Sequence, residues 1–411
     1  MDKKLIQKYA NLIVECGANV QQGQMVTIEI SIDQGEFAAM LVEECYKRGA
    51  SDVEVIWDYQ PLTKLTYKYQ SEENLSKMPK WKVEKLKYKA EMLPARILIL
   101  SNDPDGLAGI DKNKMQKVRQ KTYKIRKKYI DMMENKHQWC IASVPGYKWA
   151  KKVFPTLSKN QAYEKLWQVI LKASRVDKIT DPKDNWKAHN ENFLKRSKWL
   201  NEQKFESLEY KSSNGTDFKV GLIPEARWCG GGENTIQGTY FNPNIPTEEI
   251  FTTPMKGKAE GKLVSTKPLS YQGQIIEDFF IEFHEGKAVN WDAKKGKDLL
   301  TNMLTLDEGA SYIGEVALVP VKSPISEMGI LFYETLFDEN ASCHVAVGAG
   351  FNDTIENFEN LTNEECQKLG VNDSMSHVDF MVGTDDLEIV GIKNGEKVTI
   401  FKNGNWAFDV K

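Results

Sequence analysis

The 411-residue chain has little that would tie it to an oxidising compartment, a membrane or nucleic acid. Its six cysteines lie far apart without a CxxC pair, which fits reduced thiols better than a disulfide framework. No apolar run approaches the roughly 20 residues of a membrane span, and the first residues predict an amphipathic helix, not a secretory signal. The formal net charge of −3 provides no overall field for a polyanion. We therefore expect a cytoplasmic protein with no nucleic-acid and no membrane partner.

Phosphate-binding motifs are also absent. The expected strand Met25–Ile30 is not followed by G-x-G-x-x-G, no G-x-x-x-x-G-K-[ST] occurs, and the run Gly230–Gly232 precedes Glu233 instead of a lysine. Those glycines are more typical of a turn or of close backbone packing. One basic stretch, Lys112–Lys128, has two interpretations, a phosphate or RNA patch and a solvated helix face. We favour the helix face, because the chain as a whole is not basic.

The length predicts two domains. In the first half, four short apolar runs are separated by segments with helical periodicity. Strands that alternate with helices predict βαβ units and a parallel sheet. These four expected strands are Met25–Ile30, Val53–Trp57, Arg96–Leu100 and Trp139–Ser143. We expect an α/β domain over residues 1–185.

The second half has a different pattern. After a polar helical segment at 158–203, strand-like runs separated by turn residues dominate, which predicts an α+β domain over residues 186–411 with a mixed or antiparallel sheet. The expected strands are Phe218–Leu222, Lys262–Val264, Ile276–Phe283, Gly314–Val321, Gly329–Phe332, His344–Val347, Val378–Val382, Leu387–Val390 and Val398–Phe401.

Histidine is scarce, with five residues in the chain, and two of them lie beside carboxylates in strand-like segments. In an extended strand residues i and i+2 face the same side, so His377 and Asp379 project together while Val378 and Phe380 face the other way. An imidazole next to a carboxylate suits a divalent ion such as zinc, manganese or cobalt. A simple surface hydrogen bond is the alternative.

A second group surrounds His344, which opens an apolar strand after Asp338 and Glu339. The alternative is a turn rich in Asp and Asn that leads into a core strand. Cys343 and His344 are neighbours in a strand and face opposite ways, which argues against a Cys–His nucleophile.

Two further segments place acids at strand starts. Glu315 precedes the apolar run Val316–Val319, and Glu248 and Glu249 lie between Pro246 and a strand-like Ile-Phe-Thr. An exposed carboxylate or a capped turn would explain each of them alone. Taken together, the four segments supply the kind of ligand set that two neighbouring metal ions need.

The chain resembles the aminopeptidase T and aminopeptidase S group of bacterial metallo-aminopeptidases. The resemblance covers nearly the full length in the family's order. It includes NPNIPTEE at 242–249, GEVALVP at 314–320, TLFDENAS at 335–342, SMSHVD at 374–379, WKAHN at 186–190 and NDP at 102–104.

The resemblance implies a homodimeric exopeptidase that releases N-terminal residues from short peptides with two divalent ions (Zn, Co or Mn). It implies that the metal ligands are Glu249, Glu315, His344, His377 and Asp379, with Glu315 as the bridge. Glu339 matches a family acid near the metals, and Glu248 or Glu339 is the candidate acid for the substrate amine or for proton transfer. His189 belongs to the WKAHN motif and is interpreted as structural.

The sequence departs from the family at one position. The family has a tyrosine seven residues after the strand histidine, near the metals, and this chain has Phe351 there. The hydroxyl is therefore lost. Two hypotheses follow: an ordinary aminopeptidase that does not need the hydroxyl, or the same scaffold with weak or redirected non-peptidase metal chemistry. A third, a non-catalytic peptide-binding relative, fits the retained ligands poorly.

Overall fold

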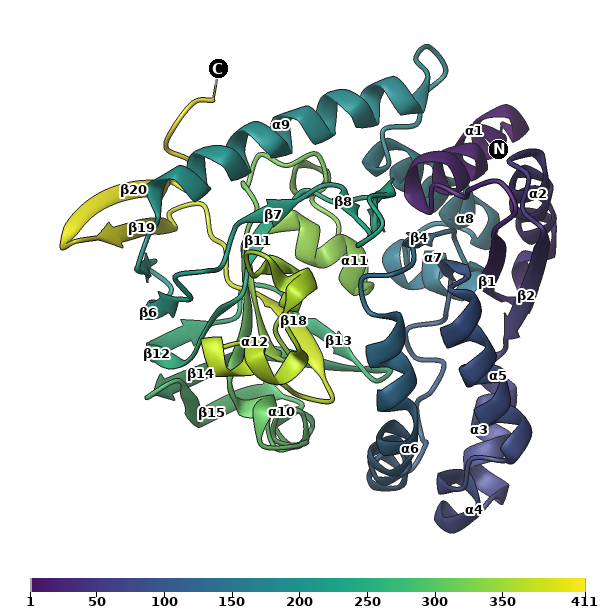
Figure 1. Ribbon diagram of the computed structural model, residues 1–411, viewed down its shortest axis with the longest axis horizontal. Coiled ribbons are helices and arrows are strands. Elements are labelled where there is room, and N and C mark those ends of the chain that lie inside the picture. The colour runs from purple at the N-terminus through teal and green to yellow at the C-terminus, as the bar shows by residue number, and fades with distance from the viewer. Residues whose placement is uncertain (1, 411) are drawn as a thin grey trace. The chain divides into compact units, whose positions relative to one another are not determined.

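The computed structural model describes residues 2–410 (Figure 1). The chain forms two compact units, and each unit takes two stretches of chain. The first contains the residues up to Ala188 together with Gly232–Pro246, and the second contains His189–Gly231 together with the residues from Thr247 onward. The domain boundary expected at residues 185/186 stays a prediction, because compactness does not show which part folds independently.

The first unit is built on a parallel sheet, as predicted. Its strands are β1 (Met25–Ser31), β2 (Asp52–Asp58), β3 (Ala95–Leu100), β4 (Trp139–Ser143), β8 (Glu233–Asn234), β9 (Tyr240–Phe241) and β10 (Asn244–Ile245). Its helices are α1 (Lys3–Leu12), α2 (Gly35–Lys47), α3 (Gln60–Tyr69), α4 (Glu72–Ser76), α5 (Lys80–Met92), α6 (Lys112–Met133), α7 (Tyr147–Val153), α8 (Lys159–Ala173) and the start of α9 (Pro182–Gln203). Five strands pair in the order β10-β4-β3-β1-β2, all parallel. The α/β prediction is confirmed.

Three aromatic side chains join helices to this sheet. The ring of Tyr9 (α1) lies 6.0 Å from that of Phe37 (α2) and 6.4 Å from that of Trp167 (α8). The Tyr9 hydroxyl donates to the Ser143 carbonyl at the end of β4, 3.0 Å away. Helices α1, α2 and α8 therefore share one apolar layer beside the sheet (Figure 1).

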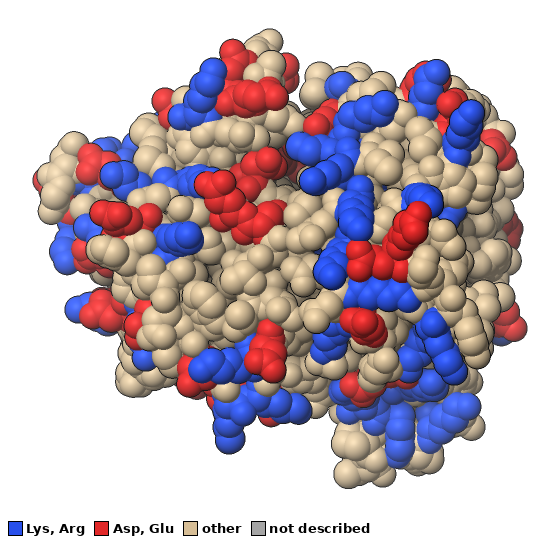
Figure 2. All heavy atoms as spheres, turned by 90° about the horizontal axis from the view of Figure 1, so that it is seen from below, with Lys and Arg blue, Asp and Glu red and all other residues tan. Residues whose placement is uncertain are grey.

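The basic stretch lies within α6 and carries surface ion pairs. Lys121 and Lys117 lie 2.7 and 3.7 Å from the Glu72 carboxylate on α4, and both lysines are more than half exposed. Acidic side chains are interspersed among the basic ones on the face drawn in Figure 2. Such exposed pairs contribute little to stability, because water and salt screen them.

The second unit is built on antiparallel sheets, which confirms the α+β prediction. Its strands are β5 (Ser207–Lys211), β6 (Asp217–Leu222), β7 (Cys229–Gly230), β11 (Ile250–Thr252), β12 (Pro254–Val264), β13 (Leu269–Tyr271), β14 (Gln274–His284), β15 (Lys287–Lys295), β16 (Ile313–Leu318), β17 (His344–Gly348), β18 (His377–Met381), β19 (Glu388–Lys393), β20 (Glu396–Lys402) and β21 (Asn405–Trp406). Its helices are α10 (Lys297–Leu304), α11 (Thr335–Asp338) and α12 (Asn363–Leu369), besides the rest of α9.

Two sheets of this unit matter for the site. A small sheet has the order β18-β17-β16-β11-β7, and a nine-stranded sheet runs β13-β14-β12-β6-β5-β19-β20-β21 with β15 beside β14. The expected strand Gly329–Phe332 is wrong, because this segment is a loop. The Asp338 carboxylate accepts the backbone N–H of Phe332 in place of a neighbouring strand, and Tyr333 has a φ of 56°, which ends an extended run.

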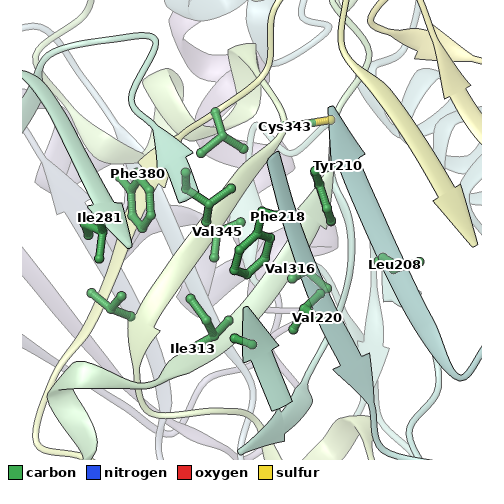
Figure 3. Close-up of a cluster of buried hydrophobic side chains, with 14 of the residues drawn as sticks. Leu208, Tyr210, Phe218, Val220, Ile281, Ile313, Val316, Cys343, Val345 and Phe380 are labelled. Carbon is green, nitrogen blue, oxygen red and sulfur yellow. The ribbon is translucent and has the colours of Figure 1, made fainter. Parts of the chain in front are cut away.

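The core of the second unit lies between these two sheets. Figure 3 shows Tyr210, Phe218 and Ile281 from the large sheet close to Val316, Val345 and Phe380 from the small one. All are nearly inaccessible to solvent. One face of β16, β17 and β18 therefore packs in the core, and the opposite face can carry polar side chains.

Across the described residues, every helix is either too short or too polar to span a bilayer.

Candidate metal centre

The predicted ligands gather on the small sheet, on the face opposite the core. In the antiparallel register Ala346 of β17 pairs with Glu315 of β16 on one side and with Asp379 of β18 on the other. Directly paired residues point to the same side of a sheet, so these three side chains form a row. The methyl group of Ala346 in the middle of the row leaves space between the two carboxylates.

Alternation along each strand separates the two faces. Val345 and Val347 point into the core beside Val378 and Phe380, while His344, His377 and Asp379 point to the polar face. Cys343 faces the core side and bonds the Val319 backbone through Sγ, at 3.3 Å, as expected from its strand position. The apolar pattern of the strands thus positions the polar side chains.

His377, Glu315 and Asp379 form one group. The His377 Nε2 lies 3.0 Å from a Glu315 oxygen and 3.2 Å from Asp379 Oδ1. On the other side of the ring, Nδ1 donates to the Ala349 carbonyl at 2.7 Å, because a carbonyl can only accept. Gly348, at φ 108°, lets the end of β17 approach the residue before β18 closely. A Cβ at Gly348 would lie 2.0 Å from the Ser376 carbonyl oxygen.

His344, Glu249 and Glu315 form the other group. Glu249 immediately precedes β11, and its carboxylate lies 2.9 Å from His344 Nε2. The His344 Nδ1 donates to the Ser342 carbonyl at 3.1 Å. Each histidine therefore has Nδ1 anchored on the backbone and Nε2 directed at carboxylates, the arrangement that orients a metal-binding imidazole.

Glu315 belongs to both groups. One ligand atom from each of Glu249, Glu315 and His344 lies within 4.8 Å of the others, and the same holds for Glu315, His377 and Asp379. Glu315 is 4% exposed, at the centre of the polar face. Glu315 is therefore the carboxylate that the two groups share.

The remaining acids lie beside these groups and outside both. Glu339 interacts electrostatically with Asp379, Glu249, His344 and Glu315, and Asn340 Nδ2 contacts its Oε1 at 3.4 Å. Glu248 is 9% exposed and its Oε2 lies 4.0 Å from His189 Nε2. Glu339 is thus close to the ligand groups without belonging to them, whereas Glu248 adjoins Glu249 in the chain and has its side chain near His189.

Burial and the closeness of several carboxylates shift the pKa values of the groups in the cluster. Burial opposes charging of His344, but the adjacent Glu249, together with Asp379 and Glu315, outweighs it and raises the pKa of His344 to about 10. Burial raises the pKa of Glu315 to about 7 despite the contact with His377. Burial opposes charging of Asp379, but His377 and His344 together outweigh it and lower the pKa of Asp379. Binding of a cation to such groups displaces protons from them.

The side chains present fit divalent metal ions. Carboxylate oxygens and imidazole nitrogens are the ligands that zinc, cobalt and manganese accept. Asp379 Oδ1 is buried, and within residues 2–410 it has no partner with hydrogen-bond geometry, although His377 Nε2 is near. A buried acceptor without a donor is costly, and a metal ion would satisfy it.

Phe351 lies against the cluster. Its ring centroid is 4.7 Å from that of His377 and 5.6 Å from that of Phe251. Thr253 Oγ1 accepts the Phe351 backbone N–H at 2.9 Å, which fixes the start of the loop after β17. The position at which the resemblance implies a family tyrosine is therefore beside a predicted ligand in this chain.

The structure brings His189 to the segment that carries Glu249, a contact that the sequence did not predict. His189 Nε2 lies 2.8 Å from the Thr247 carbonyl, directly before Glu248 and Glu249 in the chain. Nothing in the sequence linked His189 to a segment 58 residues away, because α9 carries no local pattern that points to a partner.

Comparisons with known proteins identify the family of the chain. The family model described as "Thermophilic metalloprotease (M29)" matches residues 2–406. The chain is 40% identical to aminopeptidase AmpS of Bacillus subtilis over 407 residues, 98% of each protein, and 35% identical to aminopeptidase T of Thermus thermophilus over 98% of this chain and 99% of that one. The solved structure of wild-type AmpT from Thermus thermophilus matches with a TM-score of 0.89 at 34% identity, covering 99% of this chain and all of that chain. The chain therefore belongs to the thermophilic metalloprotease (M29) family and is a metal-dependent hydrolase.

Proposed function

We propose that the protein is a two-metal aminopeptidase that releases N-terminal amino acids from short peptides. The observation that carries the proposal is the shared Glu315, which joins the group of Glu249 and His344 to the group of His377 and Asp379. Relatives of nearly equal length are named aminopeptidases, which supports the exopeptidase assignment. The native metal, the cytoplasmic location and the homodimer stay predictions.

In this proposal the five ligands hold two divalent ions, which would acidify a water molecule and polarise the scissile carbonyl. The backbone carbonyls of Ser342 and Ala349 hold the two imidazole rings so that each Nε2 faces the carboxylates, where it would be available to a metal ion. The core strands behind the ligands keep them in place before substrate arrives, so little reorganisation is needed during reaction.

Removal and return of metal tests the proposal. Protein dialysed against a chelator should lose hydrolysis of leucine p-nitroanilide and recover it with zinc, cobalt or manganese, at about two ions per chain. The N-acetylated substrate is the matched control and should stay uncut, because an aminopeptidase needs the free amine. Full activity in metal-free protein, or equal cleavage of the acetylated substrate, would contradict the proposal.

Glu339 is the candidate group for the substrate amine or for proton transfer, because it lies beside the ligands and outside both ligand groups. We expect Glu339→Gln to lower kcat/KM about 10²-fold, the usual contribution of a positioned acid or base. Metal content should stay as in wild type, which separates this role from ligation. Glu248→Gln is the paired variant, and a residue whose variant retains full turnover has no such role.

A second candidate function is weak or redirected metal chemistry on the same scaffold, and the presence of Phe351 beside His377 is the observation that favours it. Activity on aminoacyl substrates distinguishes it from the first.

A further inference from the structure

The peptide group between Thr247 and Glu248 is held on both sides by side chains from distant parts of the chain. Its carbonyl accepts from His189 Nε2 at 2.8 Å, and its N–H donates to Asn340 Oδ1 at 2.6 Å. Both partners lie in the second compact unit with the peptide. The paired part of β11 starts later, at Ile250, so the strand ladder does not hold this peptide.

Both partners are themselves well fixed. The Asn340 side chain is fully buried and its Nδ2 donates to the Leu336 carbonyl at 2.8 Å, which determines that Oδ1 faces the Glu248 N–H. The His189 ring packs on Phe193 one helical turn later on α9, with centroids 4.3 Å apart. A carbonyl can only accept, so Nε2 of His189 carries the proton.

The clamped peptide leads directly to two of the site's carboxylates. Glu249, whose oxygen lies 2.9 Å from His344 Nε2, is one residue further on. Asn340 also contacts Glu339 Oε1 at 3.4 Å. One amide side chain thus connects the Glu248–Glu249 segment with the segment that carries Glu339.

We propose that His189 and Asn340 are positioning residues, which clamp the Thr247–Glu248 peptide and thereby hold Glu249 at the distance and orientation that metal binding requires. The inference rests on the proposed two-metal function and adds two residues to it. Partners that orient a ligand typically change metal affinity by about 10–100-fold when they are lost.

Two sets of variants test the clamp in the full-length protein. His189→Leu removes the donor, whereas His189→Gln keeps an N–H that can reach the Thr247 carbonyl. Asn340→Ala removes the acceptor of the Glu248 N–H. Asn201→Ala is the matched control, because Asn201 likewise bonds the backbone N–H and carbonyl of a distant residue, Trp228, at 2.7 and 3.1 Å, and touches no predicted ligand.

The measurements are zinc and cobalt dissociation constants by calorimetry, the visible absorption spectrum of the cobalt form, and thermal unfolding of the metal-free protein. We expect His189→Leu and Asn340→Ala to bind metal about 10–100-fold more weakly and to shift the cobalt bands. His189→Gln should restore most of the affinity. Asn201→Ala should unfold at lower temperature with metal affinity unchanged.

Equal affinities in His189→Leu and His189→Gln, or no larger loss in Asn340→Ala than in Asn201→Ala, would overturn the clamp while the two-metal function stands. Absence of metal binding in the wild type would overturn both. If Asn340→Ala does not fold, the two His189 variants alone decide the outcome.

Discussion

Glu315→Gln should remove most of the activity and at least one of the two proposed ions. Glutamine keeps the size of the side chain but offers one weak oxygen ligand and no charge, so it cannot serve both ligand groups. Lewis-acid stabilisation is worth several kcal/mol, and each 1.36 kcal/mol is tenfold in rate, so we expect kcat to fall by about 10³-fold or more. Metal analysis and aminopeptidase kinetics on the same preparation measure both effects.

The matched control is Glu209→Gln, the same substitution on β5 at a carboxylate that pairs with Lys397 at 2.8 Å in the other sheet. It should keep both ions and full activity. If Glu315→Gln behaves like this control, Glu315 is no bridge and the two ligand groups do not act as one centre.

Phe351→Tyr should raise kcat. The ring that would carry the new hydroxyl is 4.7 Å, centroid to centroid, from His377, so the hydroxyl would be added next to the predicted ligands. One donor that stabilises a transition state is worth about 10²–10³ in rate. Steady-state kinetics with several metals measures the gain.

Phe251→Tyr is the matched control, since Phe251 packs on Phe351 with centroids 5.6 Å apart and receives the same chemical change. A gain confined to Phe351→Tyr would show that the missing hydroxyl at position 351 lowers the kcat of this chain. Unchanged kcat in Phe351→Tyr would mean that the hydroxyl is dispensable, and the ordinary aminopeptidase would remain.

The parts of the site that follow from local rules could be predicted from the sequence. His377 and Asp379 are two residues apart in a strand. In the structure both lie on one face, with His377 Nε2 3.2 Å from Asp379 Oδ1. Four of the five parallel strands of the first unit followed from apolar runs bounded by helices, and β10 was not predicted. The segments that carry Glu315, His344 and Glu248–Glu249 also drew attention as acids or a histidine at strand starts, and the resemblance then chose Glu249 over Glu248 as the expected ligand.

Contacts that depend on register or on distant segments could not be predicted in this way. The row of Glu315 and Asp379 on either side of Ala346 exists because three strands pair in one register, which periodicity does not specify. His189 reaches Thr247 through the packing of α9. The loop Gly329–Phe332 looked like a strand because its residues are apolar, yet a buried carboxylate, Asp338, takes over the role of a neighbouring strand.

The alternation along β17 has a consequence for how this enzyme tolerates change. A slip of β17 by one residue would turn His344 and Ala346 into the core and Val345 and Val347 out to the polar face. Such a register error would cost both the buried apolar area and the metal centre at once. Misaligned chains should therefore be unstable as well as inactive, so cellular quality control could remove them before they accumulate as folded, metal-free protein.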